Sequence, residues 1–158
     1  MSETSDPDPT RIVVDADVLA ADLLVGEAAR ETMDTVRSHS WLDLVATEPL
    51  LEDAVAVIET LGDPELADEW RETVTERVVL VEQPAGDHPA LAAAYRGKAT
   101  QIVSLDDRLR SPEAGANLRK YLDVSVRSPV AFNAVVDPAA MYELAFEKPY
   151  PGPDLDPR

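Results

Sequence analysis

The stretch "RIVVDADVL" (residues 11–19) carries an apolar run directly into two aspartates, Asp15 and Asp17. The apolar residues before them are continuous rather than alternating, which is typical of a strand buried on both faces of a parallel sheet. Carboxylates that follow such a strand lie where it emerges from the sheet, and they repel one another unless a positive group lies between them. The stretch therefore predicts a buried first strand that ends in an acidic site.

The rest of the chain repeats this strand-then-helix order. Short apolar runs alternate with amphipathic segments, a pattern that predicts an α/β fold, with three α/β/α layers around a central parallel sheet of about five strands. We expect a disordered N-terminus over 1–10, one domain over 11–136, and a C-terminal helix with a proline-rich tail over 137–158. The further expected strands are 42–47, 77–82, 101–105 and 123–127, and the expected helices are 17–25, 26–38, 48–61, 63–76, 87–97, 112–121 and a short one from residue 129.

Composition narrows the classes of protein that fit. The 158 residues contain no cysteine and only two histidines, His39 and His88, so disulfides, thiolate metal sites and a histidine-rich zinc site are not expected. No apolar run approaches the roughly 20 residues of a membrane span, and residues 1–10 lack the features of a signal peptide. We therefore expect a cytoplasmic protein without a membrane segment.

The charge balance is strongly acidic. The chain has 31 acidic and 14 basic residues, a formal net charge of −17, and only three of the basic residues are lysine. Acids spread over every face, with arginine preferred to lysine, are typical of a salt-adapted, halophilic source, where molar salt shortens the Debye length to about 3 Å and screens repulsion of nucleic acid. Seven basic residues gather between 96 and 127, which makes Lys98, Arg108 and Arg110 candidates for contacts with an anionic polymer.

Further acidic residues follow the strands expected downstream. Asp106 and Asp107 come directly after the strand at 101–105, and Asp87 opens a helix a few residues after the strand at 77–82. Because the carboxyl ends of parallel strands meet at one edge of a sheet, we expect these acids to lie near Asp15 and Asp17.

The helix expected at 48–61 contributes a fourth position. Its apolar stripe leaves Glu52 on the solvated face, whereas Asp53 lies beside the stripe and is expected to face the sheet edge rather than water. Several carboxylates gathered there need a cation, and oxygen ligands suit Mg²⁺ or Mn²⁺.

Three motifs in this order resemble those of the PIN domain, a family of metal-dependent ribonucleases. They are "VVDADVL", "EPLLEDAV" and "DHPALAAAYRGKATQIVSLD", and the similarity extends over about residues 11–135, including "SPVAFN". The third motif is the most specific, because its aspartate, alanine-rich helix, glycine, strand and Ser-x-Asp follow the family's order and spacing.

The resemblance implies a metal-dependent endoribonuclease, of the toxin or RNA-processing type, that hydrolyses RNA phosphodiesters with Mg²⁺ or Mn²⁺. It also implies RNA as substrate and an antitoxin or other protein as partner. The apolar segment "AFNAVVDPAAMYELAF" (131–146) favours a homodimer or a partner surface, although core packing explains it equally well. Asp17 stands where Asn or Ser is common and Asp53 where Glu is usual, so Glu52 stays open as the alternative ligand, and Asp107 adds a further carboxylate. By this resemblance the four metal-holding, catalytic acids are Asp15, Asp53, Asp87 and Asp106, with Asp17, Ser104 and Asp107 as auxiliary residues.

Two other functions stay open. "VVDADV" also resembles the opening motif of haloacid-dehalogenase-like phosphatases, in which Asp15 would be the nucleophile and Thr47, Lys98 and the pair Asp106–Asp107 would fill the later motifs. That family gives no role to Asp53 or Asp87. The third possibility is a catalytically silent PIN-like interaction module.

Overall fold

The computed structural model describes residues 8–83, 88–109 and 124–157. Within these residues the chain forms five strands and seven helices, and all strand pairs are parallel. The expected α/β class is therefore confirmed. The strands are β1 (Asp8–Val14), β2 (Asp43–Ala46), β3 (Val78–Leu80), β4 (Ala99–Val103) and β5 (Ser125–Arg127), and the helices are α1 (Ala16–Leu24), α2 (Glu27–Arg37), α3 (Glu48–Leu61), α4 (Pro64–Thr75), α5 (Pro89–Gly97), α7 (Pro129–Val135) and α8 (Pro138–Phe146).

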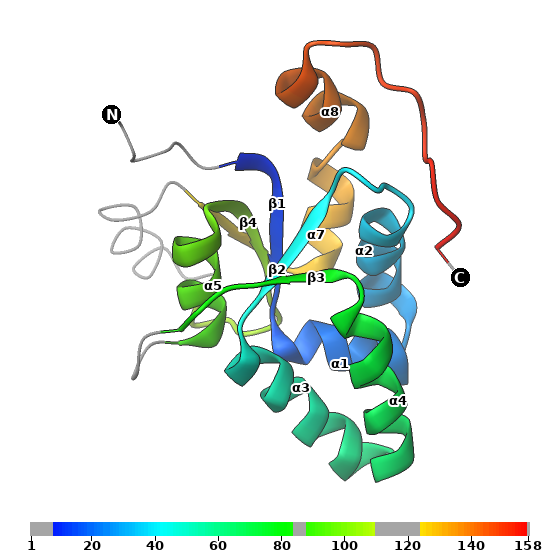
Figure 1. Ribbon diagram of the computed structural model, residues 1–158, viewed down its shortest axis with the longest axis vertical. Helices are drawn as coiled ribbons and strands as arrows, with labels where there is room; N and C mark the ends of the chain where they lie inside the picture. Colours follow the sequence, from blue (N-terminus) through cyan, green and yellow to red (C-terminus); the bar gives the residue numbers. More distant parts are fainter. Residues whose placement is uncertain (1–7, 84–87, 110–123, 158) are drawn as a thin grey trace.

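The strand order is β3-β2-β1-β4-β5, which places β1 at the centre of the sheet. Figure 1 shows α5 on one side of the sheet and α2 and α7 on the other, which gives the three layers expected from the sequence. The strand centres are fully buried, as the continuous apolar runs predict; Ile12, Val45 and Ile102 are each 0% exposed. Within the described residues, no helix is long and apolar enough to span a membrane.

Local sequence signals fix where the helices begin. Thr47 and Asp63 cap α3 and α4 through their side chains, and each helix has proline in its first turn. α5 ends at Gly97, which lies directly against the sheet. A Cβ atom at that position would collide with the side chain of Val45. The packing of α5 on β2 therefore requires glycine there.

The structure also bears on the predictions for the two ends of the chain, and residues 112–121 fall outside what it describes. β1 begins at Asp8, so residues 8–10 belong to the sheet and the prediction that they are disordered is wrong. The predicted helix at 112–121 lies outside the described residues. The C-terminal helix is α8, and the tail after it docks on the loop between α2 and β2, where the hydroxyl of Tyr150 bonds His39 Nε2 at 2.6 Å and Asp154 accepts from the backbone N–H of Ser40 at 2.7 Å.

Candidate functional site

The candidate site lies where the direction of the sheet order reverses. From β1 the chain builds β2 and β3 on one side of the sheet, and it then returns to build β4 and β5 on the other. In open parallel sheets the crevice at such a reversal, beyond the carboxyl ends of the strands, is the usual place for a ligand. Asp15 directly follows β1 and Ser104 directly follows β4, and the N–H of Asp15 donates to the carbonyl of Val103 at 2.9 Å.

Asp15 is the most firmly held carboxylate at this edge. It is 7% exposed, and as the N-cap of α1 its Oδ1 accepts from the N–H of Ala16 at 2.8 Å. Its Oδ2 accepts from the hydroxyl of Ser104, which is fully buried, also at 2.8 Å. Each carboxylate oxygen has a second lone pair, so these bonds fix the orientation of the group without using all its acceptor capacity.

Asp17 lies in the first turn of α1 and reaches towards the end of β4, where its Oδ1 accepts from the N–H of Leu105 at 3.4 Å. Burial raises the pKa of Asp17, and the charges of Asp15 and, more weakly, Asp106 raise it further, although backbone hydrogen bonds from Leu105 and Val18 oppose the shift. The charges of Asp15 and Asp106 therefore both act on Asp17, as expected for acids at one edge of the sheet.

Asp106 is held by its own turn. Its backbone N–H donates to Ser104 Oγ at 3.0 Å, so the same hydroxyl connects Asp15 and Asp106. Its carboxylate accepts from Arg108 through the backbone N–H at 2.9 Å and through Nε and Nη2 at 3.2 Å each. The hydrogen bonds from Arg108 lower the pKa of Asp106, and a smaller contribution comes from the charge of His88. Arg108, expected to contact substrate, here pairs with a predicted metal ligand.

The structure corrects the expected surroundings of Asp53. Both Glu52 and Asp53 are exposed, so Asp53 is not turned away from water as predicted. The physical reason is that the buried stripe of α3 is narrower than the apolar pattern: Val57, one turn after Asp53, is only half-buried. On the opposite flank Glu48 forms an ion pair with Arg71 of α4, and helical rotation puts Asp53 about 140° from Glu48, on the side away from α4.

The remaining candidates divide into three groups. Asp107 is exposed beside Asp106. Lys98 is the C-cap of α5 and precedes β4, so it lies at the opposite end of that strand from Ser104, and the structure does not bring it to the acidic edge. Asp87 and Arg110 lie outside the described residues.

Sequence reasoning missed two residues near this edge. His88, rather than Asp87, is the N-cap of α5, with its Nδ1 accepting from the N–H of Ala90 at 3.1 Å, and its charge acts on Asp106. The signal for it was present, because a polar residue directly before a proline is a common helix N-cap. Gln83 follows β3 and accepts from the hydroxyl of Thr47 at 2.7 Å. Nothing in the local sequence indicates that long-range bond.

The donor chemistry at the edge suits a hard divalent cation. The side chains are carboxylates; burial and, after it, the charge of Asp15 raise the pKa of Asp17, and a bound cation would offset both effects. Within the described residues, however, no three Asp, Glu or His side chains converge closely enough to hold a metal ion. A site built on Asp15, Asp17 and Asp106 therefore needs Asp106 to exchange the guanidinium of Arg108 for the metal.

The comparisons with known proteins give a family but no activity. No curated protein matches the chain, and no solved structure matches it. The model of a family of unknown function, DUF7384, matches residues 6–158. The chain therefore belongs to the DUF7384 family.

Proposed function

We propose that this protein is a metal-dependent endoribonuclease that hydrolyses RNA phosphodiesters at the carboxyl ends of β1 and β4. The observation that carries the proposal is the position of Asp15, Asp17 and Asp106 at the reversal point of the sheet, where the hydroxyl of Ser104 is hydrogen-bonded to both Asp15 and Asp106. The RNA substrate, and the roles of Asp53 and Asp87 as further ligands, rest on the resemblance to PIN domains.

The residues at this edge would have different roles in such a site. Asp15 and Ser104 are buried and mutually bonded, so they form its rigid part. Arg108 is exposed and can turn from Asp106 towards the phosphate backbone of a bound strand. Mg²⁺ or Mn²⁺ held by these carboxylates would neutralise the charge of the scissile phosphate and acidify the attacking water. No nucleophilic side chain is then needed.

A protein partner is part of the proposal. Val130, Val135 and Leu144 of α7 and α8 are between 61% and 73% exposed, and α8 has no buried residue. Exposed apolar side chains on neighbouring helices favour an interface, with either a second copy of the chain or an antitoxin-type protein. The oligomeric state in molar KCl, measured by light scattering, distinguishes these partners.

Two observations weigh against the phosphatase alternative. The hydroxyl of Thr47, which would fill a later motif of that family, is buried, donates to Gln83 and caps α3 by accepting from the N–H of Leu50. Lys98 lies at the far end of β4 from Asp15. Both residues therefore have structural roles or positions that do not suit that chemistry.

The test is incubation with structured RNA in molar KCl, with Mn²⁺ or with EDTA. We expect cleavage that needs the metal, is lost in Asp106→Asn, and stays within a few-fold in Asp107→Asn, which removes the same charge from the exposed neighbour. Hydrolysis of an aryl phosphate monoester that survives Asp87→Ala, with no RNA cleavage, would instead support the phosphatase. Neither activity in a folded, metal-loaded protein would support the silent module.

A second pair of variants tests the α3 ligand. Since Glu52 and Asp53 are both exposed, neither alanine substitution should change the free energy of unfolding by more than about 0.5 kcal/mol. We expect Asp53→Ala to abolish metal-dependent cleavage and Glu52→Ala to leave it within a few-fold. The reverse result would make Glu52, the residue type usual in PIN domains, the ligand.

A further inference from the structure

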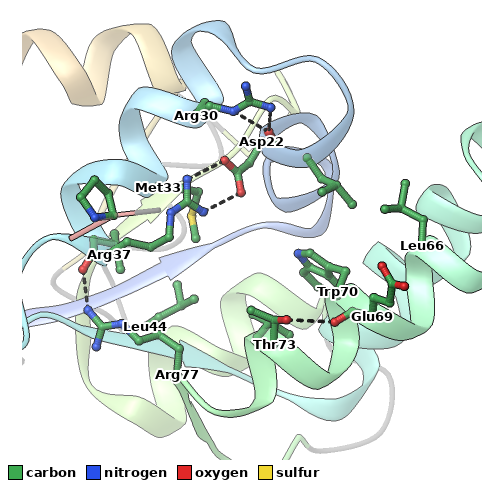
Figure 2. A pocket seen from close by; sticks show the side chains of 14 residues that line it. Asp22, Arg30, Met33, Arg37, Leu44, Leu66, Glu69, Trp70, Thr73 and Arg77 are labelled. Atoms are coloured by element: carbon green, nitrogen blue, oxygen red, sulfur yellow. Dashed lines mark hydrogen bonds and ion pairs between the residues drawn. The ribbon is translucent and has the colours of Figure 1, made fainter. Parts of the chain in front are cut away.

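A cavity of about 530 Å³ opens between α2 and α4, over the start of β2 (Figure 2). None of the residues predicted for the acidic edge lines it. Its apolar wall includes Met33, Leu44, Leu66, Trp70 and Val74. Cavities of this size, mostly apolar and with a few convergent polar groups, are the usual form of a small-molecule site.

The charged residues that line the cavity reverse the balance of the whole chain. Acids outnumber bases 31 to 14 overall, whereas the lining has three arginines, Arg30, Arg37 and Arg77, and two acids, Asp22 and Glu69. Asp22 and Arg37 neutralise each other, because Arg37 donates to both carboxylate oxygens of Asp22, at 2.8 and 2.9 Å. Two arginines, Arg30 and Arg77, then remain in the lining against one acid, Glu69. The cavity therefore carries a small excess of positive charge on a strongly acidic protein, which favours an anionic ligand.

The guanidinium groups are held in place but not fully used. Arg77 donates to the carbonyls of Val36 and His39 through Nη2 alone, and Arg30 donates to the carbonyl of Asp22 through Nε and Nη2. In the part of the chain that the structure describes, the other donors of these two arginines have no acceptor. Donors fixed in this way are already oriented for carboxylate, sulfonate or phosphate oxygens.

The C-terminal tail closes one side of the cavity. Pro157 is part of the lining, and the tail before it is held by bonds from the N–H groups of Asp154 and Leu155 to the carbonyl of Ser38, at 2.9 and 3.1 Å. Trp70 presents a flat ring on the wall formed by α4 (Figure 2). The cavity thus combines an aromatic surface with arginines at both ends of α2.

We propose that this cavity binds a small organic anion with a planar aromatic body. The aromatic part packs against Trp70 and the apolar wall, and the anionic group takes the remaining donors of Arg77, at the C-terminal end of α2. The proposal does not depend on ribonuclease activity, because it uses a different face of the sheet and different residues.

The experiment titrates the full-length protein with anilinonaphthalene sulfonate and with its uncharged analogue N-phenylnaphthylamine, by probe fluorescence. KCl is kept at the lowest concentration at which the protein retains a cooperative unfolding transition. We expect saturable binding of one sulfonate probe per chain and clearly weaker binding of the uncharged analogue. Failure of the sulfonate to saturate, or equal affinity for both probes, overturns the proposal.

Three variants at exposed positions of α4 test whether the probe binds in the cavity, and they leave the core unchanged. Thr73→Glu adds a negative charge to the lining and should weaken sulfonate binding about three- to five-fold, and Glu69→Gln should strengthen it by a similar factor. Glu72→Gln makes the same charge change outside the lining and should leave the affinity unchanged. An equal effect of Glu72→Gln and Glu69→Gln would show a general charge effect and overturn the assignment.

Discussion

A double-mutant cycle on Ser104 and Asp15 measures the bond that holds the acidic edge together. The Ser104 hydroxyl is fully buried, donates to Asp15 Oδ2 at 2.8 Å and accepts from the N–H of Asp106 at 3.0 Å. A hydrogen bond to a charged group contributes about 1.5–3 kcal/mol, and the N–H of Asp106 lies in a half-exposed turn where water can replace the hydroxyl. We therefore expect Ser104→Ala to lower the free energy of unfolding by about 2–3 kcal/mol, or the melting temperature by roughly 4–12 °C.

The assay is urea denaturation in EDTA at fixed KCl for the wild type, Ser104→Ala, Asp15→Asn and the double variant. In the Asp15→Asn background the bond is between neutral groups, so the cost of Ser104→Ala should fall by about 1 kcal/mol or more. Ser125→Ala is the control, because its hydroxyl on the neighbouring strand β5 makes no hydrogen bond within the described residues, and it should show no coupling. A coupling of zero between Ser104 and Asp15 would show that this hydrogen bond does not stabilise the acidic edge.

Further substitutions test the charges around this edge and the tail. Because burial and neighbouring carboxylates raise the pKa of Asp17, its charge destabilises the folded state; Asp17→Asn should stabilise the metal-free protein at pH 7, and the gain should shrink as the pH falls through the raised pKa towards about 4. Urea denaturation across this pH range measures it, and a pH-independent gain equal to that of Asp107→Asn would contradict the shift. Arg108→Ala should tighten Mn²⁺ binding several-fold in calorimetry by removing the competing cation, and weaker binding would make the arginine a support of the site. Asp154→Ala removes the acceptor for the N–H and hydroxyl of Ser40, so limited proteolysis should cut the tail faster while the core stays resistant; an unchanged rate would show that this anchor is dispensable.

The sheet was predictable because its strands are buried on both faces. Fully buried strands need continuous apolar runs, so the run ending at Val14 and the run ending at Val103 could each be recognised locally. Carboxylates directly after such strands then had to lie at one edge, and the charge effects of Asp15 and Asp106 on Asp17 agree with this. What the sequence predicted best was the position of side chains fixed by the backbone.

Side chains beyond the strand ends were predicted less well. The predicted position of Asp53 depended on the width of the apolar stripe of α3. Half-buried residues such as Val57 belong to that stripe in the sequence, but they lie outside the buried surface that α3 packs against the rest of the protein. Arg108 was expected on substrate, yet a flexible exposed side chain takes whichever acceptor is nearest, here Asp106. The order of the sequence alone places Lys98 away from the acidic edge, because Lys98 precedes β4 whereas Asp106 follows it.

Long-range contacts left no local signal at all. The bond between Tyr150 and His39 joins residues 111 apart, and the arginines of the cavity are scattered between positions 30 and 77. The local excess of basic residues along the sequence lies in 96–127 and does not include the arginines of the cavity. These arginines come close to one cavity only because the fold brings α2 and α4 together. Proximity of this kind depends on topology rather than on periodicity.

The proposed function requires that the carboxylates after β1 and β4 bind a divalent metal ion. The most direct measurement is Mn²⁺ binding by electron paramagnetic resonance in molar KCl, where binding to scattered surface acids is screened. We expect saturable binding of one or two ions in the wild type, loss of that binding in Asp15→Asn, and no change in Glu52→Gln. Binding that is absent from the wild type, or that survives Asp15→Asn undiminished, would contradict it.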